Sequence, residues 1–394
     1  PFSLTSAQEN ALNEITADQA APYKMLRLLQ GDVGSGKTVV ALLSMLKVIE
    51  EGAQTALMAP TEILAKQHFE TISTLCENAN VTVGLLTGKL KAKEKREIYE
   101  KLAAGEIDIL IGTHALFTEQ VVFKDLAYVV IDEQHRFGVN QRLSLSAKGM
   151  LCDVLVMTAT PIPRSLLLTA YGDMDYSKIG ELPKGRKPAQ TVVINVSKMP
   201  DVINALSRKL AEGTRAYWVC PLVDESEKSD LAAATERYEM LQQYFGAKVG
   251  LIHGKMKETE KDAVMEEFKK GNITLLVATT VIEVGVNVPE ATIMIIEHAE
   301  RFGLAQLHQL RGRIKRGFEA GNCILLYSYP VSAVAKERMN IMKQTEDGFY
   351  IAEKDLELRG GGEVLGTRQS GFTQFKLADM SAHQDLLIKA RDDV

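Results

Sequence analysis

Cysteine and aromatic residues are scarce in this sequence. It contains four cysteines, one tryptophan and 6% Phe, Trp and Tyr among 394 residues. The cysteines are scattered without the spacing of metal ligands, which argues against a disulfide framework or a zinc site and favours reduced, buried thiols. Long apolar runs are lacking too: none approaches the roughly 20 residues of a membrane span, and the first residues do not follow the signal-peptide pattern.

An excess of positive charge is also absent, since the formal net charge is −5 at pH 7. The sequence therefore does not indicate nucleic-acid binding through a global positive field, although it leaves room for a local basic groove. The hydrophobic fraction of 46% and the charged fraction of 25% are those of an ordinary globular protein. At this length two domains are expected.

A glycine-rich segment near the start is the most informative stretch that is present. Residues 31–38 match G-x-x-x-x-G-K-[ST] between an apolar, strand-like run and a helical pattern. Such a loop points backbone N–H groups and a helix N-terminus at phosphate, so we predict a nucleoside triphosphate site rather than a glycine turn without a ligand. We expect Lys37 to reach the β- and γ-phosphates and Thr38 to hold Mg²⁺. The predicted binding residues are Gly31, Gly34, Ser35, Gly36, Lys37 and Thr38.

The first 180 residues alternate apolar runs with helical patterns, which predicts an α/β fold with a parallel sheet. A segment rich in proline and cations, 183–188, interrupts this pattern and is typical of a linker. The alternation then restarts, so we predict two α/β lobes of similar size. The predicted boundaries are 1–182 for the first lobe, 183–188 for a hinge, 189–335 for the second lobe and 336–394 for a small C-terminal extension.

A second motif lies at the end of a strand-like run, Leu126 to Ile131, which is followed by Asp132 and Glu133. The ends of parallel strands are where α/β sheets place ligands. Asp132 is suited to Mg²⁺, and Glu133 is suited to orienting or deprotonating the attacking water. Alone, two carboxylates after a strand are more often a solvated turn. The upstream phosphate loop makes us predict catalytic roles.

Several motifs together resemble the superfamily 2 helicases. In chain order they are Asp132-Glu133-Gln134-His135, Thr158-Ala159-Thr160-Pro161-Ile162-Pro163-Arg164, Ala299 to His308, Gln309 to Gly317, and Asp355 to Gly371. Within that superfamily they are similar to the motor core of the RecG family of branched-DNA translocases. The last stretch also resembles the translocation motif that this family shares with Mfd. The resemblance covers essentially the whole chain.

The resemblance implies two RecA-like lobes that clamp ATP, with a short hinge and a translocation-motif extension. Lys37, Asp132 and Glu133 would act from the first lobe. Arg313 and Arg316 would act from the second as arginine fingers on the γ-phosphate, and on a helix their three-residue spacing places them on one face. A lone pair of arginines at this spacing is otherwise a solvated helix face.

Further ATP contacts are implied less directly. Phe2 and Gln8 resemble the segment that stacks on and reads adenine, although Thr5 ahead of a helix is also simply an N-cap. Gly285 and Asn287 match the motif that touches both ATP and DNA, but the family has Asp where this chain has Asn287, which puts ribose contact in doubt. Lys315 replaces a family glycine between the two arginines.

Turns between strands and helices are the expected DNA contacts, because backbone N–H groups and hydroxyls at helix starts bind phosphate without reading bases. Singly, each such turn is more often a helix cap. In the tail, Arg359 and Gln369 would transmit lobe movement to duplex DNA, unless the tail is only a packing helix. The predicted DNA-binding residues are Thr61, Thr87, Gly88, Thr113, His114, Gly254, Thr279, Arg359 and Gln369.

The resemblance implies an ATP- and Mg²⁺-dependent DNA helicase, monomeric and in the bacterial cytoplasm near the nucleoid, that reverses stalled forks and migrates four-way junctions. The family carries a wedge domain upstream of the motor, so we expect this chain to be a fragment. Two other readings stay open. One is an Mfd-like translocase motor. The other is a nucleotide-dependent DNA-binding module whose hydrolysis is impaired by Lys315 and Asn287.

Overall fold

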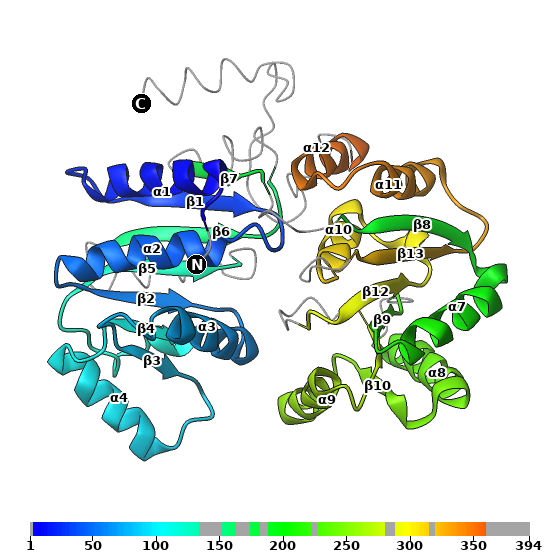
Figure 1. The fold of residues 1–394 in the computed structure, drawn as a ribbon, viewed down its shortest axis with the longest axis horizontal. Helices are drawn as coiled ribbons and strands as arrows, with labels where there is room; N and C mark the ends of the chain where they lie inside the picture. The colour runs from blue at the N-terminus through cyan, green and yellow to red at the C-terminus, as the bar shows by residue number, and fades with distance from the viewer. Residues whose placement is uncertain are drawn as a thin grey trace. The chain divides into compact units, whose positions relative to one another are not determined.

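The structure is a computed structural model that describes residues 3–133, 152–162, 174–181, 188–221, 227–279, 288–314 and 320–359. The chain divides into two compact units, each built on its own sheet (Figure 1). Helices and parallel strands alternate in both units. The predicted fold class, α/β with two parallel-sheet lobes, is therefore confirmed.

The first unit contains a seven-stranded sheet with the order β3-β4-β2-β5-β6-β1-β7, in which every pairing is parallel. Apart from β7, each strand coincides with an apolar run of the sequence. The strands are β1 (Leu26–Gly31), β2 (Gln54–Met58), β3 (Val83–Leu86), β4 (Ile109–Gly112), β5 (Leu126–Asp132), β6 (Asp153–Thr158) and β7 (Asp175–Ile179). The helices are α1 (Ser6–Gln19), α2 (Lys37–Glu50), α3 (Glu62–Leu75), α4 (Ala92–Ala104) and the 3₁₀ turn η1 (His114–Phe117).

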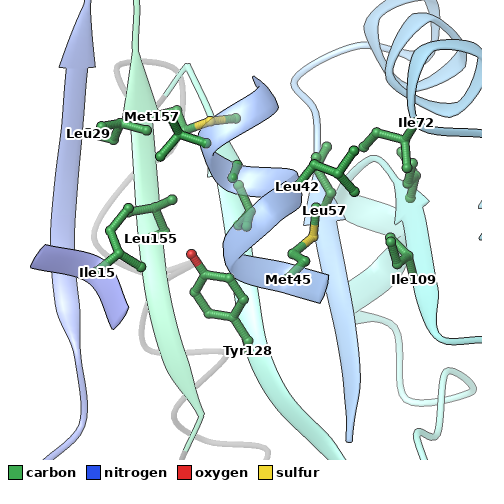
Figure 2. Packing of buried hydrophobic residues seen from close by; sticks show 14 of the residues in the cluster. Ile15, Leu29, Leu42, Met45, Leu57, Ile72, Ile109, Tyr128, Leu155 and Met157 are labelled. Carbon is green, nitrogen blue, oxygen red and sulfur yellow. The ribbon is translucent and has the colours of Figure 1, made fainter. Parts of the chain in front are cut away.

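Successive side chains of a strand point to opposite faces of the sheet, so neighbouring residues report on its two faces. Both faces of this sheet are buried. Leu57 and Tyr128 belong to a cluster that includes side chains of α1, α2 and α3, whereas their neighbours Met58 and Val129 belong to a second cluster with Leu102 of α4. Figure 2 shows the first cluster, with Leu42 and Met45 of α2 among the buried strand residues. Burial on both faces explains why these strands are continuous apolar runs.

The second unit contains a six-stranded parallel sheet with the order β10-β11-β9-β12-β13-β8. Its core surrounds Trp218, which is fully buried. The strands are β8 (Gln190–Asn195), β9 (Arg215–Val219), β10 (Val249–Ile252), β11 (Leu275–Ala278), β12 (Ala291–Ile296) and β13 (Asn322–Tyr327). The helices are α7 (Met199–Ala211), α8 (Glu227–Phe245), α9 (Glu258–Lys270), α10 (Leu304–Gly312), α11 (Ala333–Gln344) and α12 (Gly348–Arg359), with the 3₁₀ turns η3 (Val196–Lys198), η4 (Gly246–Lys248) and η6 (Ala299–Arg301).

The domain boundaries remain predictions. Most of the predicted hinge, residues 182–187, lies outside the described residues. The predicted boundary between the second lobe and the extension, at 335/336, falls within α11. None of the described helices has the length and the apolar character needed to cross a membrane.

Candidate nucleotide and nucleic-acid site

The predicted site residues of the first unit gather at one edge of its sheet. In a parallel sheet all strands end at the same edge, where α/β proteins bind ligands. The phosphate loop follows β1, Asp132 ends β5, and Thr61, Thr87 and Thr113 follow β2, β3 and β4. From the strand order, the three threonine turns occupy the β3-β4-β2 half of this edge. The phosphate loop and Asp132 occupy the β5-β6-β1 half.

The phosphate loop is shaped by two glycines with positive φ, Gly34 (80°) and Gly36 (90°), which other residues adopt only at a cost. A Cβ at Gly31 would lie 2.4 Å from Ser35 Oγ, and one at Gly36 would lie 2.3 Å from Gln8 Nε2. The Ser35 hydroxyl is buried and makes no hydrogen bond within the part of the chain that the structure describes. A glycine cradle with an unsatisfied buried hydroxyl fits a phosphate group.

Lys37 is the first residue of α2, and its ammonium group lies back across the loop. Nζ donates to the carbonyl oxygens of Gly31 at 2.6 Å and Asp32 at 3.1 Å. The lysine charge is therefore held beside the loop and the N-terminus of α2, where a phosphate group is stabilised by both.

Gln8, which is predicted to read adenine, contacts the phosphate loop; its role toward the base stays a prediction. Its Nε2 donates to Ser35 O at 2.7 Å, and its Oε1 accepts from Thr5 N at 2.9 Å in a capping box at the start of α1. Gln8 is 4% exposed. The side chain thus joins the start of α1 to the phosphate loop.

Asp132 is paired with a residue that the sequence reasoning missed. His68 of α3 places Nε2 2.8 Å from Asp132 Oδ2, and both side chains are buried. Burial works to raise the pKa of Asp132, but the hydrogen bond from His68 and the charges of His68 and Lys37 outweigh it and hold the pKa below its ordinary value. Asp132 is therefore an ionised carboxylate that only accepts hydrogen bonds, so Nε2 of His68 carries the proton.

Glu133 follows directly in a left-handed backbone conformation, with φ of 53°. A non-glycine residue in this region is uncommon, and such strain concentrates at functional sites. Glu133 N donates to Met157 O of β6 at 2.9 Å, which fixes this conformation beside the neighbouring strand. At the end of β6, Thr158 Oγ1 is 2.8 Å from Thr160 Oγ1, so the predicted Thr-Ala-Thr motif forms a closed turn at the same edge.

The expected DNA-contacting turns of the first unit lie on adjacent strands. Thr61 is the N-cap of α3 and accepts from Leu64 N at 3.3 Å. Lys89, next to Gly88, forms an ion pair at 3.6 Å with Glu62 in the first turn of α3, so the Thr87–Lys89 turn lies against the start of that helix. Thr113 is the N-cap of η1, and His114 is exposed. Thr87 and Thr113 are buried.

In the second unit, Gly254 follows β10 and Thr279 follows β11, so these two predicted DNA contacts also lie at the end of neighbouring strands. Thr279 N donates to Ile252 O at 3.3 Å. Arg313 is the C-cap of α10 and is half-buried. α10 ends at Gly312, and Arg316 lies outside the described residues, so the shared face of the two arginines stays a prediction.

Arg311 is a second residue whose role the sequence did not reveal. It is fully buried, and its NH1 donates to Met342 O at 2.6 Å and Thr345 O at 2.9 Å at the end of α11. A cation is favourable at a helix C-terminus. Arg311 therefore ties α10, which carries the arginine motif, to the helices that lead into the C-terminal extension.

Several predicted site residues lie outside the described residues, so their roles stay predictions. For Arg359, the last residue of α12, the structure gives the backbone but not the side chain. The predictions that fall outside are Phe2, Gly285, Asn287, Arg316 and Gln369.

The donors predicted for Mg²⁺ fit this ion. Asp132 offers an ionised carboxylate, and Thr38 offers a hydroxyl from the first turn of α2; hard oxygen ligands of this kind are those that Mg²⁺ prefers. The phosphate loop follows β1 and Asp132 ends β5, so both lie at the same edge of the sheet, and the charge of Lys37 contributes to the lowered pKa of Asp132. No cluster of three or more His, Cys, Asp or Glu side chains that could hold a metal alone occurs among the described residues.

Family models match three consecutive parts of the chain. A DEAD/DEAH box helicase model matches residues 5–168, and a helicase conserved C-terminal domain matches residues 197–317. A model described as ATP-dependent DNA helicase RecG, domain 3, C-terminal, matches residues 345–394. The fold and these matches define the class of protein: the two-lobed helicase region of superfamily 2.

Proteins that are similar in sequence indicate which family of this class the chain resembles. The chain is 53% identical over its full length to the ATP-dependent DNA helicase RecG of Bacillus subtilis and covers 58% of that protein. It is 51% identical over 98% of its length to the RecG of Escherichia coli K12 and covers 57% of it. The chain therefore belongs to the RecG family and corresponds to its motor region. It spans less than two thirds of these relatives.

Solved structures with a similar fold support the same assignment. A structure of RecG bound to a three-way DNA junction matches 98% of this chain and 50% of the solved chain, with a TM-score of 0.83 and 45% identity. An RNA-bound Dbp5 from S. cerevisiae matches 99% of this chain and 93% of its own, with a TM-score of 0.60 and 17% identity. The first match shows that the lobes are those of the RecG motor, and the second supports the fold alone.

Proposed function

We propose that this chain is an ATP-dependent motor that moves on branched duplex DNA. The observation that carries the proposal is the sheet edge of the first unit. There, the glycine cradle and Lys37 lie on the same half of the edge as the carboxylate of Asp132. Membership of the RecG family supports DNA as the partner, and the three-way junction in the related structure supports a branched one.

The chemistry assigns one task to each group. The loop N–H groups and Lys37 bind the β- and γ-phosphates. Thr38 and Asp132 would hold Mg²⁺, which would neutralise charge on the transferred phosphate. Glu133 orients or deprotonates the attacking water. Arg313 and Arg316 stabilise the charge that develops on the γ-phosphate, an effect worth about 10³–10⁵ in rate in other nucleotide hydrolases. Gln8 and Phe2 contact the adenine, and Gly285 and Asn287 contribute from the second lobe.

For DNA, we propose contacts that need few cations. Hydroxyls and backbone N–H groups at Thr61, Thr87–Gly88 and Thr113–His114 bind phosphates from the first lobe, and those at Gly254 and Thr279 do so from the second. Arg359 and Gln369 act on the duplex from the extension. This mode is compatible with a net charge of −5. We further propose that the motor acts on DNA in the bacterial cytoplasm, near the nucleoid, because the similar RecG proteins are bacterial.

ATP hydrolysis measured without DNA, with linear duplex, and with three-way and four-way junctions tests the proposal. We expect the junctions to stimulate turnover most. Lys37→Ala should abolish turnover, because it removes the charge proposed to bind phosphate, and it should leave the fold intact, because Nζ bonds to two carbonyl oxygens of the loop. Lys47→Ala, at the exposed far end of α2, is the matched control and should behave as wild type.

Two results would contradict the proposal. If Lys37→Ala still hydrolyses ATP at the wild-type rate, the phosphate loop is not the nucleotide site. If nucleotide binds but no DNA stimulates hydrolysis, the chain is a nucleotide-dependent binding module and not a motor.

A further inference from the structure

One polar contact at the sheet edge is not explained by the fold alone. His68 extends from the middle of α3 to the carboxylate that ends β5, 64 residues later in the chain, and the N···O distance is 2.8 Å. The exposed fractions are 9% for His68 and 8% for Asp132. Burying an imidazole and a carboxylate costs free energy unless they bond well to one another, and this pair does.

The contact takes up one oxygen of a carboxylate that the proposed function assigns to Mg²⁺. His68 bonds to Oδ2, which fixes the rotation of the carboxylate about its Cβ–Cγ bond and sets the direction of Oδ1. Metal-binding carboxylates commonly have such hydrogen-bonded partners, and these orient the ligand and tune its basicity. A buried hydrophobic residue at position 68 would fill the same space without this effect.

The position of α3 is a second reason to assign a role to the contact between His68 and Asp132. In the sheet order β3-β4-β2-β5, the helix follows β2, which pairs directly with β5. Its N-cap is Thr61, on the half of the edge that carries the threonine turns, while His68 contacts the half that carries the phosphate loop. The histidine therefore joins the rigid helix to the last residue of β5.

We propose that His68 is a positioning residue that holds the Asp132 carboxylate in the orientation that binds Mg²⁺. It touches neither nucleotide nor DNA and acts only through Asp132. The inference rests on the proposed function, because it assumes that Asp132 binds the metal of a nucleotide complex.

Two substitutions separate the hydrogen bond from packing. His68→Leu keeps a buried side chain and removes the donor, whereas His68→Gln returns an N–H group near the place of Nε2. We expect His68→Leu to weaken metal affinity by about 10- to 100-fold, the range found when outer partners of metal ligands are removed. We expect His68→Gln to recover most of that loss. Ile72→Val, one turn further along α3 and fully buried, is the matched control and should leave metal affinity unchanged.

The readout that does not depend on turnover is Mn²⁺ binding to the ADP complex, measured by electron paramagnetic resonance, with Mn²⁺ as the probe for Mg²⁺. ADP binding in EDTA, without metal, should be the same in all variants, which shows that the loop and the fold are intact. In ATP hydrolysis, His68→Leu should raise the half-saturating Mg²⁺ concentration.

The inference is overturned if His68→Leu binds Mn²⁺ as wild type does, or if His68→Gln is no better than His68→Leu. Failure of the proposed function looks different: wild-type protein would then bind no metal–nucleotide complex, or would bind it without hydrolysis on any DNA. Normal wild-type activity with unaltered metal affinity in His68→Leu would refute only the role of His68.

Discussion

Gln54 illustrates how single polar residues hold this fold together. It begins β2 and is 4% exposed, and its amide makes four hydrogen bonds to backbone groups. Nε2 donates to Leu102 O and Ile107 O, and Oε1 accepts from Lys124 N and Asp125 N. One side chain thus bonds to backbone groups at the end of α4, just before β4 and just before β5. It lies at the opposite end of β2 from the site.

We predict that Gln54→Leu destabilises the protein by about 3 kcal/mol, because the backbone groups of Ile107, Lys124 and Asp125 lose this hydrogen-bond partner. Urea-induced unfolding measures this, and Glu50→Ala, exposed at the end of α2, should change stability by less than about 0.5 kcal/mol. ATP hydrolysis per folded molecule should be unchanged. A stability loss no larger than that of the control would show that water replaces the amide.

At the scale of elements, the loop between β1 and α2 depends on backbone conformation more than on side chains. Gly36 is the N-cap of α2 and has φ of 90°, and the Gln8 amide packs where its Cβ would be. Gly52, just after the other end of α2, has φ of 87° but open space around its missing Cβ. The two glycines share a backbone requirement and differ in their surroundings.

We predict that Gly36→Ala and Gly52→Ala each lose about 1–2 kcal/mol of stability, the cost of the left-handed region for a residue with a Cβ. Only Gly36→Ala should weaken nucleotide binding, by at least about tenfold, since it displaces Gln8 and reshapes the cradle. Fluorescent ADP titration of both variants measures the difference. Equal affinities would mean that the loop tolerates a side chain there.

At the scale of the whole molecule, the core of each unit is shielded from solvent. The burial of the four cysteines shows this. Cys76, Cys152, Cys220 and Cys323 are all reduced thiols and all buried, as the sequence indicated. Burial raises the pKa of the Cys76, Cys152 and Cys220 thiols, which disfavours the reactive thiolate.

We predict that the folded protein reacts slowly with a thiol reagent such as DTNB at neutral pH, whereas four thiols per chain react at once in denaturant. Raising the pH toward 9 should accelerate the native reaction less than it accelerates that of a free thiol, because the raised pKa values keep these groups protonated. Rapid reaction of a thiol in the native protein would indicate local opening of the unit that contains it.

Features that depend on neighbours in the chain could be predicted from the sequence. The phosphate loop is one, since its glycines, Lys37 and Thr38 act within eight residues. The strand that ends at Asp132 is another, because burial on both faces requires a continuous apolar run. Strand β7 has no such signal, because its sequence, Asp175–Ile179, has few apolar residues. It is held by pairing with β1 and by the hydrogen bond that Arg27 donates to Ser177.

The sequence by itself determined the fold class and the two lobes, and it predicted the type of ligand, since periodicity and local motifs encode them. Only the tertiary structure decided that His68 meets Asp132, that Gln8 contacts the phosphate loop, and that Arg311 joins α10 to the end of α11. The two residues of each contact lie 27 to 64 positions apart in the sequence. Strand order and helix packing bring such residues together, and no local pattern records that.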